Sequence, residues 1–180
     1  MGIEVEKKYR LTAEQRASLA TRLVETGATE RKREFETNTL YTGNNLDRER
    51  TVLRLRRTER GATLTYKVRH SNHSGIKHNR EDETSIGDAD ALDVIFTALG
   101  YKPFIVYEKR RTTWDVASVE LVIDELPFGW FAEIEGTEQG IAEAEAVLAL
   151  TGVEAVAETY PELTELYGRR DGDIIAARFD

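Results

Sequence analysis

Polar and apolar side chains alternate along eight stretches of this chain, and four other stretches have apolar side chains at helical spacing. Successive side chains of a β-strand point to opposite faces of the sheet, so the alternation predicts strands. Glycine, asparagine, aspartate and serine cluster between these strands, and the connections favour antiparallel neighbours. The predicted strands span residues 2–10, 34–42, 51–58, 62–69, 78–86, 104–115, 118–126 and 130–136.

Four segments have the spacing of amphipathic helices. The first begins at Thr12, where Thr-Ala-Glu-Gln has the form of a capping box, and it ends at Gly27. The second begins near Asp88, the third spans roughly 138–151, and the fourth begins at Thr159. Each presents an apolar face that needs a sheet or another helix to pack against.

Charged residues in the predicted strands are grouped by sign. In several strands the alternate positions are apolar, as at Leu53 and Leu55, so these strands have one charged face and one apolar face. Basic pairs occur at Arg54 and Arg56, Lys67 and Arg69, and Lys109 and Arg111; acidic pairs occur at Glu4 and Glu6 (followed by Lys8), Glu81 and Glu83, and Glu133 and Glu135, and Asp124 is a further acid.

Two arrangements account for the charged faces. In one, they lie in water on an ordinary sheet, where cross-strand ion pairs contribute little to stability. In the other, the strands close into a barrel and the charged faces line its lumen. The grouping by sign favours the barrel, because ion pairs on a surface would more often mix signs. The predicted fold class is therefore α+β, an eight-stranded antiparallel β-barrel (tunnel) with a charged lumen, covered outside by amphipathic helices.

A lumen with this many cations needs a ligand, because burying unpaired arginine or lysine is costly in free energy. A chain of phosphates would pair with them, and the planar fork of arginine suits phosphate oxygens. The carboxylates would repel phosphate unless they hold a hard divalent cation, for which an all-oxygen set suits Mg²⁺ or Mn²⁺. A metal beside a cationic clamp is typical of phosphoryl-transfer sites.

Composition narrows the function further. The 180 residues suit a single domain, placed at 1–170, followed by a tail at 171–180 that we expect to be loose. The net charge of -8 disfavours non-specific binding to nucleic acid or anionic membranes. The chain has no cysteine, which excludes disulfides, thiolate metal sites and cysteine nucleophiles. Without a signal-peptide core or an apolar stretch long enough to span a membrane, we expect a cytoplasmic protein.

The charged motifs, taken together, resemble the CYTH superfamily, which includes class IV adenylate cyclases, thiamine triphosphatases and other triphosphate tunnel metalloenzymes. The opening Glu4-x-Glu6-x-Lys8 is weak alone, but the resemblance covers nearly the whole chain. The resemblance implies an eight-stranded tunnel that binds a triphosphate and supports metal-dependent attack on a phosphoryl group. The further motifs, in order, are Leu53-Arg54-Leu55-Arg56, Thr65-Tyr66-Lys67, Arg80-Glu81-Asp82-Glu83, Glu108-Lys109-Arg110-Arg111, Ile123-Asp124 and Ala132-Glu133-Ile134-Glu135.

The resemblance also implies residue roles. Lys8 would either contact phosphate or help to deprotonate the nucleophile. The predicted catalytic residues are Lys8, Glu4 and Glu6. The implied metal ligands are Glu4, Glu6, Glu133 and Glu135, with Asp124, Glu83 and Glu81 as further acids. The implied triphosphate-binding residues are Arg54, Arg56, Lys67, Lys109 and Arg111, with Arg69 as a further candidate.

The C-terminal helix departs from part of this family. Some members place a lysine in the helix that closes over the site, whereas residues 160–167 contain none. This stretch is closer to the Tyr-x-x-Leu ending of cyclase-like and thiamine-triphosphatase-like members. The role of this helix in recognising a nucleotide or thiamine is therefore left open.

Three functions are compatible with the resemblance. The leading hypothesis is a divalent-metal-dependent hydrolase of inorganic triphosphate, a nucleoside triphosphate or thiamine triphosphate. The alternatives are an adenylate cyclase that makes cyclic AMP and pyrophosphate from ATP, and an inactive polyphosphate- or nucleotide-binding module. The expected partner is a small-molecule triphosphate, RNA is disfavoured by the acidic net charge, and a homodimer is compatible with exposed strand edges.

Overall fold

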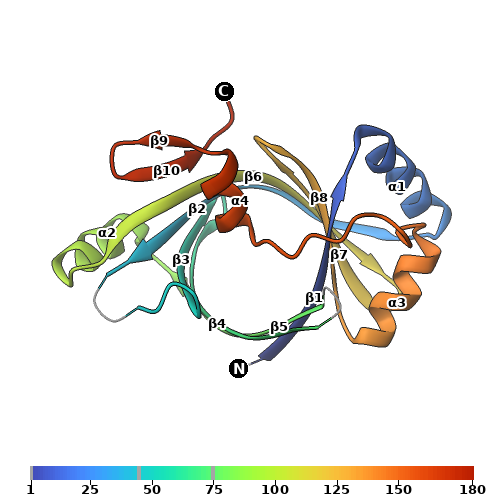
Figure 1. Ribbon diagram of the computed structural model, residues 1–180, viewed down its shortest axis with the longest axis horizontal. Coiled ribbons are helices and arrows are strands. Elements are labelled where there is room, and N and C mark those ends of the chain that lie inside the picture. The colour runs from blue at the N-terminus through green and yellow to red at the C-terminus, as the bar shows by residue number, and fades with distance from the viewer. Residues whose placement is uncertain (1, 44–45, 74–75) are drawn as a thin grey trace.

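The computed structural model of the protein describes residues 2–43, 46–73 and 76–180, and the side chains of residues 2–4, 70–73 and 76–78 are not described. The described residues form four helices and a ten-stranded sheet (Figure 1). The helices are α1 (Ala13–Glu25), α2 (Ala89–Ala98), α3 (Glu138–Val147) and α4 (Tyr160–Tyr167). The strands are β1 (Gly2–Leu11), β2 (Thr29–Thr42), β3 (Thr51–Thr58), β4 (Gly61–His73), β5 (Ile76–Ile86), β6 (Lys102–Val116), β7 (Val119–Leu126), β8 (Gly129–Glu135), β9 (Arg169–Asp171) and β10 (Ile174–Ala177).

Eight of the strands form a ring of antiparallel pairs. The order along the sheet is β2-β3-β4-β5-β1-β8-β7-β6, and β2 also pairs with β6, from Thr29 opposite Asp115 to Thr42 opposite Lys102. The two ends of the order therefore meet, and the ribbon encircles a central region (Figure 1). The α+β fold with an eight-stranded antiparallel tunnel, predicted from the alternation, is confirmed.

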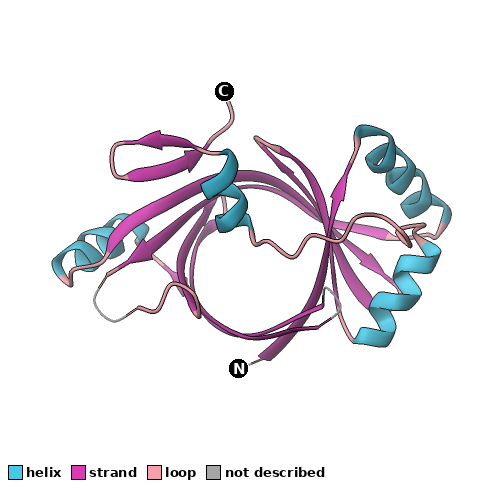
Figure 2. Cartoon of the chain, in the orientation of Figure 1, coloured by secondary structure: helices cyan, strands magenta, loops and turns pink. Residues whose placement is uncertain are grey.

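Three helices lie outside the ring, with α1 and α3 on one side and α2 on the opposite side (Figure 2). Each covers the apolar face of strands whose other face is polar. Among the described residues, no helix has the length and apolar character needed to cross a bilayer. The cluster under α1 and α3 includes Leu19, Leu23, Leu121, Ile134 and Ile141, and the cluster under α2 includes Tyr41, Leu55 and Phe96.

The sequence fixes the ends of the helices through local hydrogen bonds. At the start of α1, the Thr12 hydroxyl accepts the backbone N–H of Gln15, whose side chain accepts the N–H of Thr12. Thr159 and Glu162 form the same reciprocal pair at the start of α4. After α1 the chain turns at Gly27, whose φ of 70° lies in the left-handed region that favours glycine.

The segment between α3 and α4 crosses in front of the ring in Figure 1 and binds to β1. The backbone N–H of Val156 donates to the carbonyl of Lys8, and that of Arg10 donates to the carbonyl of Glu154. These hydrogen bonds hold the segment against β1 as it runs from α3, outside the ring, to α4 at one opening of the tunnel. The last predicted helix thereby becomes part of the tunnel wall.

The C-terminal residues differ from the expected loose tail. β10 pairs in parallel with β6, where Ile175 is opposite Ile105, and β9 pairs antiparallel with β10. The backbone N–H of Phe179 donates to the carboxylate of Glu108, and its ring packs near Phe35. Alternation could not predict this extension, because β10 has only four residues and its partner lies far away in sequence.

Replacing Leu121 with alanine should lower the free energy of unfolding by about 2–5 kcal/mol, because it leaves a cavity beneath α1 and α3. Leu121 is 0% exposed. Val94→Ala on α2, where the side chain is 70% exposed, is the matched control and should change stability by ~0.5 kcal/mol or less. Urea unfolding measures both changes, and equal losses would contradict this placement of the core.

Candidate functional site

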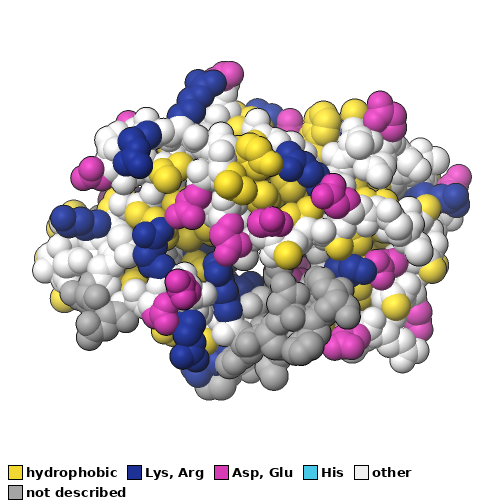
Figure 3. All heavy atoms as spheres, viewed as in Figure 1, with side chains coloured by type: hydrophobic (Ala, Val, Ile, Leu, Met, Phe, Trp, Pro, Cys, Tyr) yellow, Lys and Arg dark blue, Asp and Glu magenta, His cyan; other side chains and the backbone are white. Residues whose placement is uncertain are grey.

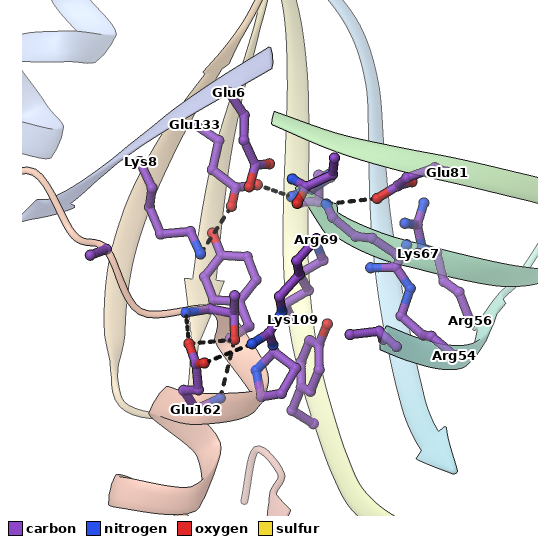
Figure 4. Close-up of a pocket in the computed structure, with 18 residues that line it drawn as sticks. Glu6, Lys8, Arg54, Arg56, Lys67, Arg69, Glu81, Lys109, Glu133 and Glu162 are labelled. Atoms are coloured by element: carbon purple, nitrogen blue, oxygen red, sulfur yellow. Dashed lines mark hydrogen bonds and ion pairs between the residues drawn. The ribbon is translucent and has the colours of Figure 1, made fainter. Parts of the chain in front are cut away.

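The ring and α4 enclose a cavity of about 350 Å³. Figure 3 shows basic and acidic side chains around a hollow near the centre of this face, and Figure 4 shows those that point into the cavity. Among the described residues of the wall, seven side chains are basic and four are acidic, although the whole chain has a net charge of -8. The basic ones are Lys8, Arg54, Arg56, Lys67, Arg69, Lys109 and Arg111, and the acidic ones are Glu6, Glu81, Glu133 and Glu162.

All of these wall residues except Glu162 were predicted as site residues from the sequence. Of the other predicted residues, Asp124 is fully buried behind the wall, while Glu83 and Glu135 are exposed and do not line the cavity. The side chain of Glu4 lies outside the described residues. The structure thus brings most of the predicted side chains together, and their individual roles stay predictions.

Asp124 of β7 anchors the basic side chains of β6. Its carboxylate accepts hydrogen bonds from Arg111 Nε at 2.7 Å, from Lys109 Nζ at 3.3 Å and from the Tyr160 hydroxyl at 2.8 Å. The β6–β7 register places Arg111 directly opposite Asp124. Because Asp124 is 0% exposed and already accepts from these donors, it positions cations in this structure.

Glu36 of β2 is a second buried anchor, and the sequence analysis did not assign it. Its Oε2 atom lies 3.4 Å from Lys109 Nζ and 3.5 Å from Arg56 Nε. Burial alone would raise the pKa of Glu36, but the nearby positive charges, first that of Lys109 and then that of Arg111, hold it below its ordinary value. Glu36 is therefore a buried carboxylate that stays ionised.

A signal for Glu36 was present in the sequence. Glu34, Glu36 and Asn38 alternate along the predicted strand 34–42, with the same period as the other charged faces. Thr37 and Thr39 make the opposite face polar as well, so the pattern does not show which face turns inward.

Arg54 and Arg56 lie side by side on the wall from β3 (Figure 4). The positive charge of Arg54 lowers the pKa of Arg56, and burial lowers it further. The Nε atoms of both side chains are buried and have no hydrogen-bond partner within the described part of the chain. Arg56 Nε faces the Glu36 carboxylate at 3.5 Å without forming a hydrogen bond. Buried donors without a hydrogen bond are unusual, so this pair is suited to an anion that would accept from both.

Lys8 is 2% exposed and is held from three directions. Its Nζ lies 3.2 Å from the Glu133 carboxylate, donates to the carbonyl of Glu158 at 3.2 Å, and lies 3.8 Å from the ring centroid of Tyr160. Tyr160 is the first residue of α4, so the C-terminal helix contacts the predicted catalytic lysine directly. The sequence predicted this helix but gave Tyr160 no role, because its partners are distant in sequence.

The acidic residues meet at the β1–β8 strand pair. Glu6 is directly opposite Glu135, and Lys8 is directly opposite Glu133. Like charges directly opposite each other destabilise a strand pair. The side chain of Glu135 is exposed on one side, but its partial desolvation raises the pKa, and the charges of Glu6 and Glu81 raise it further.

The carboxylates at the β1–β8 strand pair are of the chemical type that binds a metal ion. A set of carboxylate oxygens fits a hard divalent cation such as Mg²⁺ or Mn²⁺. Among the described side chains, no group of three or more acidic or histidine residues is close enough to form a ready-made metal site. Glu4 belongs to the same face of β1 as Glu6 by alternation, but its side chain is outside the described residues.

The sequence model of the CYTH domain matches residues 2–159, which include all eight strands of the ring. The chain belongs to the CYTH domain family. Comparison with curated proteins gives no match.

Solved structures with the same fold come from several organisms. The PH1012 protein of Pyrococcus horikoshii OT3 has a TM-score of 0.75 and 21% identity, and the match covers 89% of this chain and 98% of that chain. A proposed adenylate cyclase from Vibrio parahaemolyticus has a TM-score of 0.70 and 20% identity, covering 91% and 98%. A proposed adenylyl cyclase from Hippeastrum, described as having a dominant triphosphatase activity, has a TM-score of 0.66 and 16% identity, covering 90% and 93%. These similarities show that the CYTH fold is shared.

Binding of inorganic triphosphate to this CYTH tunnel should weaken as the pH rises through about 8. Burial, followed by the charge of Arg111, lowers the pKa of Lys109 to about 8 from its ordinary 10.5. Lys109 is therefore positively charged below this pH and neutral above it, so the cavity wall has one positive charge fewer at high pH. Calorimetry in metal-free buffer from about pH 6.5 to 9.5 would measure the change.

Lys109→Arg is the matched control for this pH dependence. Its guanidinium stays charged throughout the range, so the part of the change that is due to Lys109 should disappear. An identical pH profile in the two proteins would show that a different group is responsible.

Proposed function

We propose that this protein is a divalent-metal-dependent hydrolase of a triphosphate that binds in the cationic cavity of the tunnel. The observation that carries the proposal is a pair of partly buried arginines whose buried Nε donors make no hydrogen bond within the described residues, facing the same cavity as a group of carboxylates. Membership of the CYTH family supports it. The triphosphatase activity described for the Hippeastrum protein supports it as well.

The basic residues of the wall would hold the phosphate chain. Arg54, Arg56 and Lys67 reach the cavity from β3 and β4, and Lys109 reaches it from β6 (Figure 4). Arg111 of β6 also lines the cavity. Cations from opposite sides of a ring can contact successive phosphates and fix their orientation. Positioning and charge stabilisation account for most of the catalysis in phosphoryl transfer.

Glu6, Glu133 and Glu135, together with Glu4, would hold the divalent cation. When bound, Mg²⁺ or Mn²⁺ would supply Lewis-acid stabilisation of negative charge on the phosphate oxygens. A cation at this position would also account for Glu6 and Glu135 standing directly opposite each other, since it would offset their repulsion.

Lys8 and Glu6 would have different roles in the reaction. Lys8 donates to the Glu158 carbonyl and pairs with the Glu133 carboxylate, which are contacts of a charged ammonium group. An ammonium group cannot accept a proton, so we assign Lys8 a contact with phosphate. Glu6 would accept a proton from the attacking water. The water oxygen would form a bond to the terminal phosphorus while the bond from that phosphorus to the bridging oxygen breaks. The bridging oxygen stays with the diphosphate leaving group, and the products are orthophosphate and the diphosphate.

Product analysis by ³¹P NMR tests this function. With Mg²⁺ or Mn²⁺, the protein should release orthophosphate from at least one of inorganic triphosphate, ATP and thiamine triphosphate. Pyrophosphate together with cyclic AMP from ATP would instead establish the cyclase. Binding of these compounds without any product would reject catalysis and support a binding module.

Glu6→Gln should abolish metal-dependent turnover while leaving the fold intact, because it removes a ligand charge from the lumen. A metal ion that binds the folded protein raises its melting temperature, and tighter binding raises it more. Added Mg²⁺ or Mn²⁺ should therefore raise the melting temperature of the wild type more than that of the variant. Glu125→Gln, on the outer face of β7 where it pairs with Arg110, is the control and should behave like the wild type. A variant that keeps its turnover and its metal-induced stabilisation would exclude Glu6 as a ligand.

A further inference from the structure

The start of α4 places an ion pair at one end of the cavity. Arg69 Nη1 of β4 donates to Glu162 Oε1 at 3.1 Å. In Figure 4, Glu162 lies on the opposite side of the cavity from Glu6 and Glu133. The cations of the wall therefore lie between two acidic ends.

A second cavity, of about 470 Å³, adjoins the first at this ion pair. Both walls include Val52, Arg69, Pro161 and Glu162. The second wall mixes apolar and polar side chains, and its other described basic residue, Arg48, pairs with Glu165 at 2.9 Å and lies 4.0 Å from the ring centroid of Phe104. The row of cations that could follow a phosphate chain therefore ends at Arg69.

The Glu162 carboxylate is fixed in place through both of its oxygens. Oε1 accepts from Arg69, while Oε2 accepts the backbone N–H of Thr159 at 2.6 Å and its hydroxyl at 2.8 Å. The contacts with Thr159 form part of the capping box that begins α4. Moving the carboxylate out of the cavity would therefore break the helix cap as well as the ion pair.

We propose that Glu162 limits the length of the phosphate chain that the tunnel accepts. This inference rests on the proposed function, because it requires a phosphate chain among the wall cations. A chain that extends toward α4 brings its next phosphate against the fixed carboxylate of Glu162, whose partner Arg69 is already engaged. Glu162 is thus a specificity-determining residue that favours triphosphate over longer inorganic polyphosphates.

The test compares two matched substitutions in α4. Glu162→Gln removes the charge and keeps the capping box, because glutamine also serves at this position. Glu165→Gln removes a charge from the same helix, and its side chain is 41% exposed, as is that of Glu162. Calorimetry would give the Kd of inorganic triphosphate and of inorganic tetraphosphate for each protein, and released orthophosphate would be measured in parallel.

Glu162→Gln should shift the ratio of the two Kd values toward tetraphosphate by about tenfold relative to the wild type, as expected for removal of one nearby like charge. Glu165→Gln should leave the ratio within about twofold, because its partner Arg48 lies beyond the phosphate path. If Glu162→Gln does not fold, Arg69→Gln replaces it. That variant leaves the carboxylate without its arginine partner and should shift the ratio against tetraphosphate.

An unchanged ratio in Glu162→Gln, or an equal shift in Glu165→Gln, would overturn the proposal. The ratio is a binding quantity, so it tests Glu162 even without turnover. A shifted ratio without released phosphate would reject hydrolysis and retain the chain-length role, whereas hydrolysis with an unchanged ratio would do the reverse. Failure of the wild type to bind either anion would reject both.

Discussion

The cationic lumen depends on two carboxylates buried behind it, Glu36 and Asp124. An ammonium or guanidinium group taken out of water is strongly destabilising unless an opposite charge lies close to it. Glu36 lies between Lys109 and Arg56, and Asp124 accepts from Lys109 and from Arg111. These carboxylates reduce the repulsion without cancelling the charge of the wall. The tunnel can therefore fold before its ligand binds and still present a net positive surface to it.

The closed ring explains how residues distant in sequence come to share one cavity. Alternation along each strand separates an apolar face from a charged one, and the apolar faces must pack beneath α1, α2 and α3. Closure of the ring through the pairing of β2 with β6 then turns the charged faces toward one another. Without this pairing the same side chains would lie in water, where their ion pairs would contribute little. The burial that shifts the pKa values of Glu36 and Lys109 therefore follows from the closed topology of the ring.

The eight strands and most of the wall were predictable because both follow from a local period of two. Arg54 and Lys67, for example, alternate with apolar neighbours, so their shared face could be identified one strand at a time. Glu36 was not assigned because both faces of its strand are polar. The role of Tyr160 depends on contacts with Lys8 and Asp124, which lie far away in sequence. Local periodicity gives the direction of a side chain within its own element, whereas contacts between elements depend on how the chain is connected in space.

The two acidic ends of the cavity differ in a way that gives the tunnel a direction. At the β1–β8 end, Glu6 stands opposite Glu135, and the pKa of Glu135 is raised by partial desolvation and by neighbouring carboxylates, so a bound cation would stabilise this end. At the α4 end, Glu162 is paired with Arg69 and fixed by the helix cap, so its carboxylate is held in place without a bound cation. On the proposed function, the divalent cation and the phosphorus under attack belong at the β1–β8 end. The other end of the phosphate chain then faces α4, where a single carboxylate is enough to oppose a further phosphate.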